Sequence, residues 1–130
     1  MKILIVAATQ QEIKALLQPD LKWRDDIDFL ISGVGVIETT FKLTAFLLSN
    51  QYDLVINIGI AGAFSSELKL GEVVFVKSDC FADLGAEDVD TFMPLNEMGL
   101  KSDTADVFNA TSENKYQVKE VSAITVIADI

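Results

Sequence analysis

Three short apolar runs, separated by segments of helical character, constrain the fold of this chain more than any other feature. The first run, Ile3 to Ala8, is continuous and rich in β-branched residues, which is typical of a strand buried on both faces of a parallel sheet. Thr9 to Gln18 is predicted to be a helix, because Thr9 is a suitable N-cap, Glu12 has the capping-box spacing and Pro19 ends the segment. The chain therefore opens with a strand followed by a helix.

The next part of the chain repeats this pattern. Phe29 to Ser32 is a second apolar strand, and Val36 to Ser49 is predicted to be a helix with a broad apolar face. A third buried strand is predicted at Leu54 to Ile58. The alternation of strands and helices predicts an α/β fold of three layers around a central, mostly parallel or mixed sheet.

The second half of the chain carries weaker signals. Val73 to Val76 and Val118 to Ile127 are predicted strands, and residues 80–115 are expected to be mostly loop with at most a short helix. No linker or low-complexity tract interrupts the chain, so residues 1–130 are expected to form a single domain. The last predicted strand is followed by no helix that would cover it. We therefore expect the domain to be incomplete, or truncated, at its C-terminus.

Charge and residue content argue against several classes of function. The 20 acidic and 10 basic residues give a net charge of −10, which opposes binding to nucleic acid and to anionic membranes, so neither partner is expected. The chain has no His, which removes His-dependent catalysis and metal binding. Arg24 is the only Arg, although phosphate clamps usually rely on Arg. Cys80 is the only Cys, so no internal disulfide can form and a cytoplasmic location is expected.

Candidate binding residues lie where the predicted strands end, because ligands of parallel α/β sheets bind outside the carboxyl ends of the strands. Three strand ends are rich in small residues: Ala7-Ala8-Thr9, Ser32–Gly35 and Gly59–Gly62. Glycine there lets a ligand approach the backbone, but it also serves tight strand-to-helix turns, and the pattern alone leaves both readings open. The second segment resembles the start of a dinucleotide fingerprint with Glu38 in place of its third glycine, so no nucleotide cofactor is expected.

Acidic residues form two candidate sites. Glu12 follows the first strand and has the chemistry of a general base acting on water. An ordinary first-turn helix role, favoured by capping and by the helix dipole, is more common for a Glu at such a position. The second candidate is an acidic cluster without the glycine that a calcium loop requires, so it indicates a solvated loop and no metal site: Asp83, Glu87, Asp88 and Asp90.

Several motifs, taken together, resemble those of a known enzyme family. Gln11-Glu12-Ile13 after the first strand is similar to the opening of the methylthioadenosine/S-adenosylhomocysteine nucleosidases. The further motifs follow in the order and spacing of that family: Ser32–Gly35, Asn57–Ala63 and Leu70–Val74. Within this nucleoside phosphorylase/nucleosidase superfamily, the short segment between Pro19 and Phe29 and the stretch Phe81–Asp88 resemble futalosine hydrolase most.

The resemblance implies hydrolysis of a purine N-ribosidic bond through an oxocarbenium-like transition state, without a cofactor. For futalosine, this reaction releases hypoxanthine in menaquinone biosynthesis. The resemblance also implies that Glu12 activates the attacking water, which reverses the ordinary interpretation of that residue, and that the enzyme is a homo-oligomer, most simply a dimer. The positions that it implies for binding a purine nucleoside are Ala8, Thr9, Gly35, Ile60, Ala61 and Gly62.

Alternative functions stay open at the level of the sequence. The resemblance implies two further residues, a Glu that binds the ribose and an Asp that protonates the leaving purine, and both belong to segments later than Ile130. The 130 residues are therefore expected to show little or no hydrolysis and to be a non-catalytic fragment or a nucleoside-binding module. A methylthioadenosine/S-adenosylhomocysteine nucleosidase is a less favoured alternative. A nucleoside phosphorylase is disfavoured, because it needs cationic groups for phosphate and the chain offers a single Arg.

Overall fold

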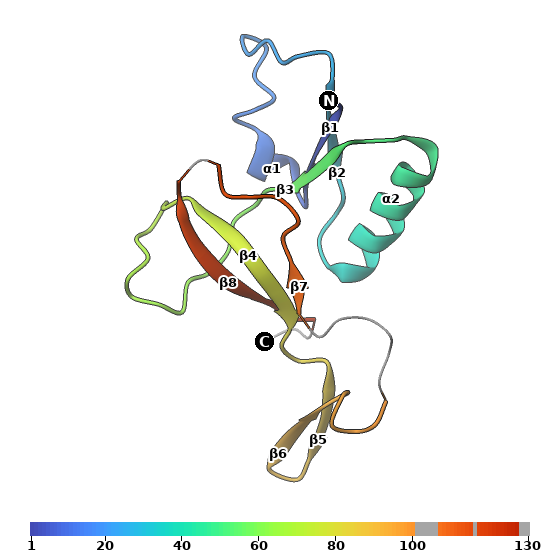
Figure 1. The fold of residues 1–130 in the computed structure, drawn as a ribbon, viewed down its shortest axis with the longest axis vertical. Coiled ribbons are helices and arrows are strands. Elements are labelled where there is room, and N and C mark those ends of the chain that lie inside the picture. The colour runs from blue at the N-terminus through green and yellow to red at the C-terminus, as the bar shows by residue number, and fades with distance from the viewer. Residues whose placement is uncertain (101–106, 116, 128–130) are drawn as a thin grey trace. The chain divides into compact units, whose positions relative to one another are not determined.

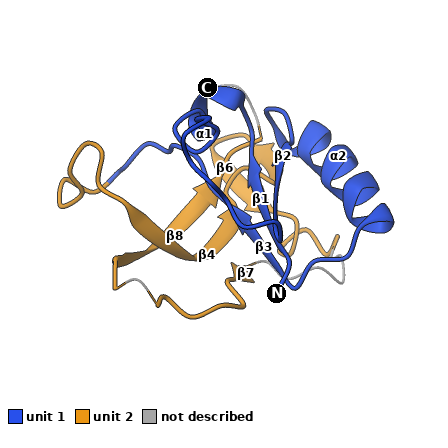
Figure 2. Cartoon of the chain, turned by 90° about the horizontal axis from the view of Figure 1, so that it is seen from above, with its two compact units in different colours: residues 1–64 blue, residues 65–130 orange. Residues whose placement is uncertain are grey.

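The computed structural model describes residues 1–100, 107–115 and 117–127 (Figure 1). Contacts divide the chain into two compact units, Met1–Phe64 and Ser65–Ile130, which Figure 2 colours separately. Among the described residues, both helices and one parallel sheet lie in unit 1, whereas unit 2 contains a mixed sheet and a hairpin. The chain is therefore an α/β protein with parallel and mixed sheets, as the alternating pattern predicts.

Unit 1 is built on a parallel sheet in which β1 (Ile3–Ala7) lies between β2 (Ile27–Ile31) and β3 (Leu54–Asn57). The apolar run explains the central place of β1, where Leu4 and Ala7 are completely buried. The prediction of a strand buried on both faces is thus confirmed for β1. It is wrong for the third strand, because β3 lies at the edge of this sheet and most of its residues are exposed.

The first helix is shorter than the predicted span of Thr9 to Gln18. The structure has α1 at Gln10–Ile13, with Ile13 completely buried and the Thr9–Glu12 capping box present. The chain then continues as turns, and the indole N–H of Trp23 donates a hydrogen bond of 2.6 Å to the carbonyl of Leu16. The helix therefore ends well before Pro19.

The second helix, α2 (Val36–Ser49), has the predicted bounds. Figures 1 and 2 both show it on the β2 side of the sheet. It contains no buried residue, and its apolar side chains are largely open: Ile37 is 85%, Phe41 75% and Leu48 84% exposed. The predicted apolar face is therefore present on the helix but is not covered within the described structure. No helix among the described residues is long and apolar enough to cross a membrane.

Unit 2 contains a mixed sheet. Its central strand, β4 (Val74–Phe81), pairs in parallel with β8 (Lys119–Thr125) and antiparallel with the two-residue β7 (Phe108–Asn109). Both predicted strands of this half are thereby confirmed. The parallel pair is strengthened across its register by hydroxyl contacts, including a hydrogen bond of 2.7 Å from Thr125 Oγ1 to the carboxylate of Asp79.

A hairpin corrects the expectation of loop for residues 80–115. β5 (Gly85–Asp88) pairs antiparallel with β6 (Thr91–Pro94). The connecting turn holds Val89 at φ 58°, a left-handed conformation that β-branched residues rarely adopt. Two-residue hairpin turns are normally recognised in a sequence by an Asn-Gly or Asp-Gly pair. This turn has no such pair, so the sequence pattern did not predict the hairpin.

Candidate active site

The loops that follow the three strands of unit 1 leave from one edge of the sheet. Backbone hydrogen bonds continue beyond the strands: the amide of Gly33 donates to the carbonyl of Ala8 (3.1 Å), and that of Ile58 donates to Val6 (2.9 Å). Because β1, β2 and β3 run parallel, their carboxyl ends meet at this edge, here called the carboxyl edge. It is the part of an α/β sheet where ligands usually bind.

Glu12 lies partly buried at the carboxyl edge, and its carboxylate joins two of these loops. Its Oε2 atom accepts hydrogen bonds from the backbone N–H of Thr9 (2.8 Å) and from Thr9 Oγ1 (3.0 Å). Its Oε1 atom accepts a hydrogen bond of 3.2 Å from the backbone N–H of Ile60. Glu12 therefore links the loop after β1 to the loop after β3, which are far apart in the sequence.

These contacts keep Glu12 ionised. Partial burial acts to raise the pKa of Glu12, but the hydrogen bonds from the backbone of Thr9, the backbone of Ile60 and the Thr9 side chain outweigh it and hold the pKa below its ordinary value. An ionised carboxylate is the form that can take a proton from water. The side chain thus has the charge that a general base needs.

Gly59 makes the approach of Glu12 to the third loop sterically possible. A Cβ atom added at Gly59 would lie 2.8 Å from Glu12 Oε1, so a larger residue would displace the carboxylate from the amide of Ile60. The sequence pattern marked Gly59 only as one of several small residues in this loop. Its specific role depends on a tertiary contact with a distant segment, which no local signal reports.

The glycine turn after β2 is held by its own set of polar contacts. Ser32 is only 2% exposed, and Thr39 Oγ1 donates a hydrogen bond of 3.1 Å to the carbonyl of Gly33. A Cβ atom on Gly33 would collide with the carboxyl group of Glu38, which also pairs with Lys42 at 2.6 Å. The space beside Gly33 is therefore filled by the Glu38 side chain and is not open to a ligand.

The candidate binding residues are not all drawn together. Thr9 and Ile60 contact Glu12 directly, and Ala8 is tied to the neighbouring glycine turn. The other three are exposed on the loops after β2 and β3, and in the described structure no hydrogen bond connects them to Glu12: Gly35, Ala61 and Gly62. Gly35 is the N-cap of α2 and has φ +89°, so its backbone conformation alone favours glycine.

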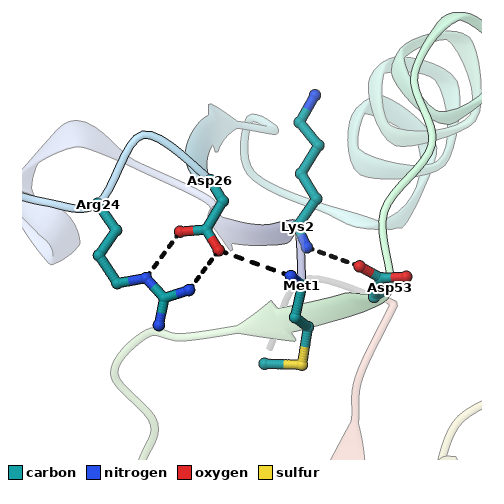
Figure 3. Close-up of polar contacts among 5 residues, drawn as sticks. All are labelled: Met1, Lys2, Arg24, Asp26 and Asp53. Carbon is teal, nitrogen blue, oxygen red and sulfur yellow. Dashed lines mark hydrogen bonds and ion pairs between the residues drawn. The ribbon is translucent and has the colours of Figure 1, made fainter.

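The opposite edge of the same sheet, here called the amino edge, collects cationic groups (Figure 3). The Arg24 guanidinium donates two hydrogen bonds to Asp26 (2.9 and 2.6 Å), and the N-terminal amine of Met1 lies 3.7 Å from the same carboxylate. The backbone N–H of Lys2 donates to Asp53 at 2.6 Å. The hydrogen bonds from Arg24 hold the pKa of Asp26 below its ordinary value. The only Arg of the chain is therefore committed to an ion pair at the amino edge.

A second ion pair lies near the amino edge. Lys2 Nζ lies 3.2 Å from Asp28 and 4.6 Å from the centre of the Tyr52 ring, and the Tyr52 hydroxyl donates a hydrogen bond of 2.6 Å to Asp28. The hydrogen bond from Tyr52, aided by Lys2, lowers the pKa of Asp28. These carboxylates are thus neutralised by cationic partners, unlike Glu12.

In the acidic cluster of unit 2, Asp83 has a structural role. Asp83 accepts hydrogen bonds from the backbone N–H of Ile127 at 2.9 and 2.7 Å. Within the described ranges, no group of three or more His, Cys, Asp or Glu side chains is arranged to hold a metal ion. Glu87 and Asp88 belong to strand β5 of the hairpin, so they are not the closed loop that a calcium site requires.

Comparison with known proteins supplies relatives for part of the chain. No family profile matches it. It is 39% identical over 80 residues to a futalosine hydrolase of Streptomyces coelicolor, an alignment that covers 58% of this chain and 34% of that protein. It is 28% identical over 100 residues to a 5'-methylthioadenosine/S-adenosylhomocysteine nucleosidase of Buchnera aphidicola, covering 65% of this chain and 43% of that protein. A futalosine hydrolase of Thermus thermophilus is 32% identical over 60 residues, 46% of this chain and 27% of the relative.

The chain spans less than half the length of each of these relatives. Their names agree with the family that the motifs around Glu12 and Gly59–Gly62 resemble. Over part of its length, this chain is thus similar to nucleosidases of the nucleoside phosphorylase/nucleosidase superfamily, and to futalosine hydrolases in particular.

Proposed function

We propose that this chain carries the water-activating half of a purine nucleoside N-ribosyl hydrolase, with Glu12 as the general base. The observation that carries the proposal is the Glu12 carboxylate at the carboxyl edge, where Thr9 and Ile60 hold it and lower its pKa. Similarity to proteins named futalosine hydrolase and nucleosidase supports the reaction class. Futalosine is the proposed substrate and hypoxanthine the proposed leaving base.

The proposed chemistry places positive charge on the sugar as the bond between the anomeric carbon and the base nitrogen breaks. The bonding electrons pass to the base, which takes up a proton from solvent as it leaves, and the oxygen of a water molecule bonds to the anomeric carbon while Glu12 takes a proton from it. A carboxylate close to the sugar also stabilises the developing positive charge. We propose that the nucleoside contacts the backbone of the three loops at the carboxyl edge: Ala8, Thr9, Gly35, Ile60, Ala61 and Gly62.

Hydrolysis is favoured over phosphorolysis by the distribution of cations. A phosphate nucleophile needs positive groups beside the sugar, usually Arg. Arg24 is bound to Asp26 at the amino edge, and Lys42, near the glycine turn at the carboxyl edge, is paired with Glu38. Water is therefore the nucleophile that this edge accommodates.

The remaining expectations of the family resemblance are part of the same proposal. We propose that the chain belongs to a single three-layer nucleoside phosphorylase-like domain, that it acts in the cytoplasm, and that it assembles as a homo-oligomer. Light scattering coupled to size-exclusion chromatography measures the last of these. A monomer at the concentrations used for the activity assay would remove oligomerisation from the proposal.

A nucleoside-binding module without catalysis is the second candidate. It is favoured by one observation, namely that the alignments cover only 27–43% of the relatives. In that case the 130 residues alone bind a purine nucleoside and hydrolyse it little.

A release assay combined with a binding assay tests both candidates. The purified protein is incubated with futalosine, methylthioadenosine and inosine, with and without phosphate, and the free base and sugar are measured. We expect little base release from the 130 residues alone, and, from a longer form that carries the remaining family residues, hypoxanthine release from futalosine at the same rate in both buffers. Ribose 1-phosphate as a product would contradict hydrolysis. Binding without release selects the module, and the absence of both binding and release excludes the two candidates together.

A further inference from the structure

The two oxygens of the Glu12 carboxylate are in different situations. A carboxylate oxygen accepts about two hydrogen bonds. Oε2 receives two, both from Thr9, at 2.8 Å from the backbone N–H and 3.0 Å from Oγ1. Oε1 receives one hydrogen bond, from the amide of Ile60 at 3.2 Å, and the backbone N–H of Ala8 makes a weaker contribution to the carboxylate as a whole. The acceptor position that is left for a water molecule therefore lies on Oε1.

We propose that Thr9 is a positioning residue for Glu12, which occupies Oε2 and thereby directs the attacking water to Oε1. This inference rests on the proposed function, in which Glu12 is the base. It gives Thr9 a role in addition to the contact with substrate that its position in the loop implies. The hydroxyl of Thr9 acts through Glu12 and does not itself take part in the transfer of the proton.

The geometry makes this role specific. Two donors from one residue fix the direction of the carboxylate plane, and the third donor comes from the loop after β3. Gly59 leaves Oε1 free to approach that loop, because a Cβ atom at this position would lie only 2.8 Å away. Oε1 thus faces the Gly59–Ile60 loop, which is part of the proposed nucleoside site. Because small displacements of a catalytic group cost rate, a carboxylate that rotated freely would be a poorer base.

Removal of the Thr9 hydroxyl isolates this effect. Thr9→Val has nearly the same shape and keeps the backbone donor but loses the O–H donor, whereas Thr9→Ser keeps both. The hydroxyl favours the ionised carboxylate, so Thr9→Val should raise the pKa of Glu12 and Thr9→Ser should restore it. A matched control is Thr125→Val, which removes a hydroxyl donor from Asp79 in unit 2 and should leave Glu12 unchanged.

The experiment is a carbon-13 NMR titration of the Glu12 side chain in the four proteins, followed by kcat and KM for base release. Thr9→Val should raise the Glu12 pKa, lower kcat by about tenfold, the effect of one hydrogen bond to a charged group, and change KM little. Identical Glu12 titration in Thr9→Val and the unmodified protein would overturn the proposal. So would a raised pKa with unchanged kcat in an active enzyme. Should Thr9→Val not fold, Thr9→Ala gives the same titration test with a smaller side chain.

The two readouts separate the inference from the proposed function. The titration does not require activity, so it tests the contact between Thr9 and Glu12 even if no nucleoside is hydrolysed. A shifted Glu12 pKa in a protein that neither binds nor cleaves any purine nucleoside would refute the function and, with it, the catalytic role of Thr9. An active enzyme with an unshifted pKa would refute the role of Thr9 alone.

Discussion

The surroundings of Glu12 at the carboxyl edge of the β2-β1-β3 sheet differ from those of the ion-paired carboxylates Asp26 and Asp28, which lie at or near the amino edge. At the amino edge, Asp26 is paired with Arg24 and Asp28 is paired with Lys2. At the carboxyl edge, Glu12 is held by two backbone N–H groups and one hydroxyl, all of which are neutral. The pKa of each of these three carboxyl groups is lowered: by neutral donors for Glu12, by the Arg24 guanidinium for Asp26, and by the Tyr52 hydroxyl together with Lys2 for Asp28.

The difference decides what each edge can do. A carboxylate paired with a cation has its charge neutralised. Such a pair mainly holds together the segments at the ends of the strands. A carboxylate held by neutral dipoles keeps its full negative charge, which remains available to a water molecule or to a positively charged sugar. We therefore propose that Glu12 at the carboxyl edge takes part in chemistry and that the amino edge gives structural support. Substitutions on the two edges should separate these roles.

The largest effect is expected for Glu12→Gln. The amide has nearly the same shape but cannot take a proton from water, so base release should fall by about 10² to 10⁴. Thermal unfolding and circular dichroism should show that the fold is retained. A variant that unfolds would instead assign Glu12 to capping of α1, and undiminished release by a folded variant would refute its role as the base.

A smaller effect, on stability and not on rate, is expected for Tyr52→Phe. This change removes the hydrogen bond to Asp28 near the amino edge, so the free energy of unfolding should fall slightly. Because the pKa of Asp28 is lowered in the folded protein, the contribution is present above the ordinary Asp pKa and is lost as the pH falls through the folded value. Urea denaturation at neutral and acidic pH measures both statements. A change in kcat as large as that of Glu12→Gln would contradict the separation of the edges.

The smallest effect is expected for Arg24→Ala. The Arg24 side chain is 73% exposed, and exposed ion pairs contribute little because water and salt screen them. We expect the same rate of base release, the same independence of phosphate and almost the same urea midpoint as in the unmodified protein. If Arg24→Ala abolished activity, the cation would belong to the site and phosphorolysis would become the better interpretation.

The sequence predicted the parts of the fold that depend on strong local patterns. The apolar run of β1, the long helix α2 and the Thr9–Glu12 capping box are all readable from residue type and spacing, and the structure has each of them. The early end of α1 was not predictable, because the residues from Lys14 to Gln18 are all good helix formers. The β5-β6 hairpin escaped prediction because its turn uses Val89 in a conformation that its residue type rarely adopts.

The candidate site also has features that the sequence predicts and features that it does not. The general position of Glu12 and of the glycine loops follows from strand order, since parallel strands present their carboxyl ends together. The contacts that prepare Glu12 do not follow from it. The amide of Ile60 and the space at Gly59 reach Glu12 only through the pairing of β3 with β1, and that register is a tertiary feature.

The pH dependence of kcat/KM tests the central claim, that an ionised Glu12 activates water, most directly. Because the pKa of Glu12 is lowered, the base is charged throughout the neutral range, and the rate should fall only at pH values below the ordinary pKa of a Glu side chain. This acid limb should be absent from the residual activity of Glu12→Gln and unchanged in Arg24→Ala. An acid limb that persists in Glu12→Gln, or one that lies well above the ordinary Glu value, would show that another group is the base.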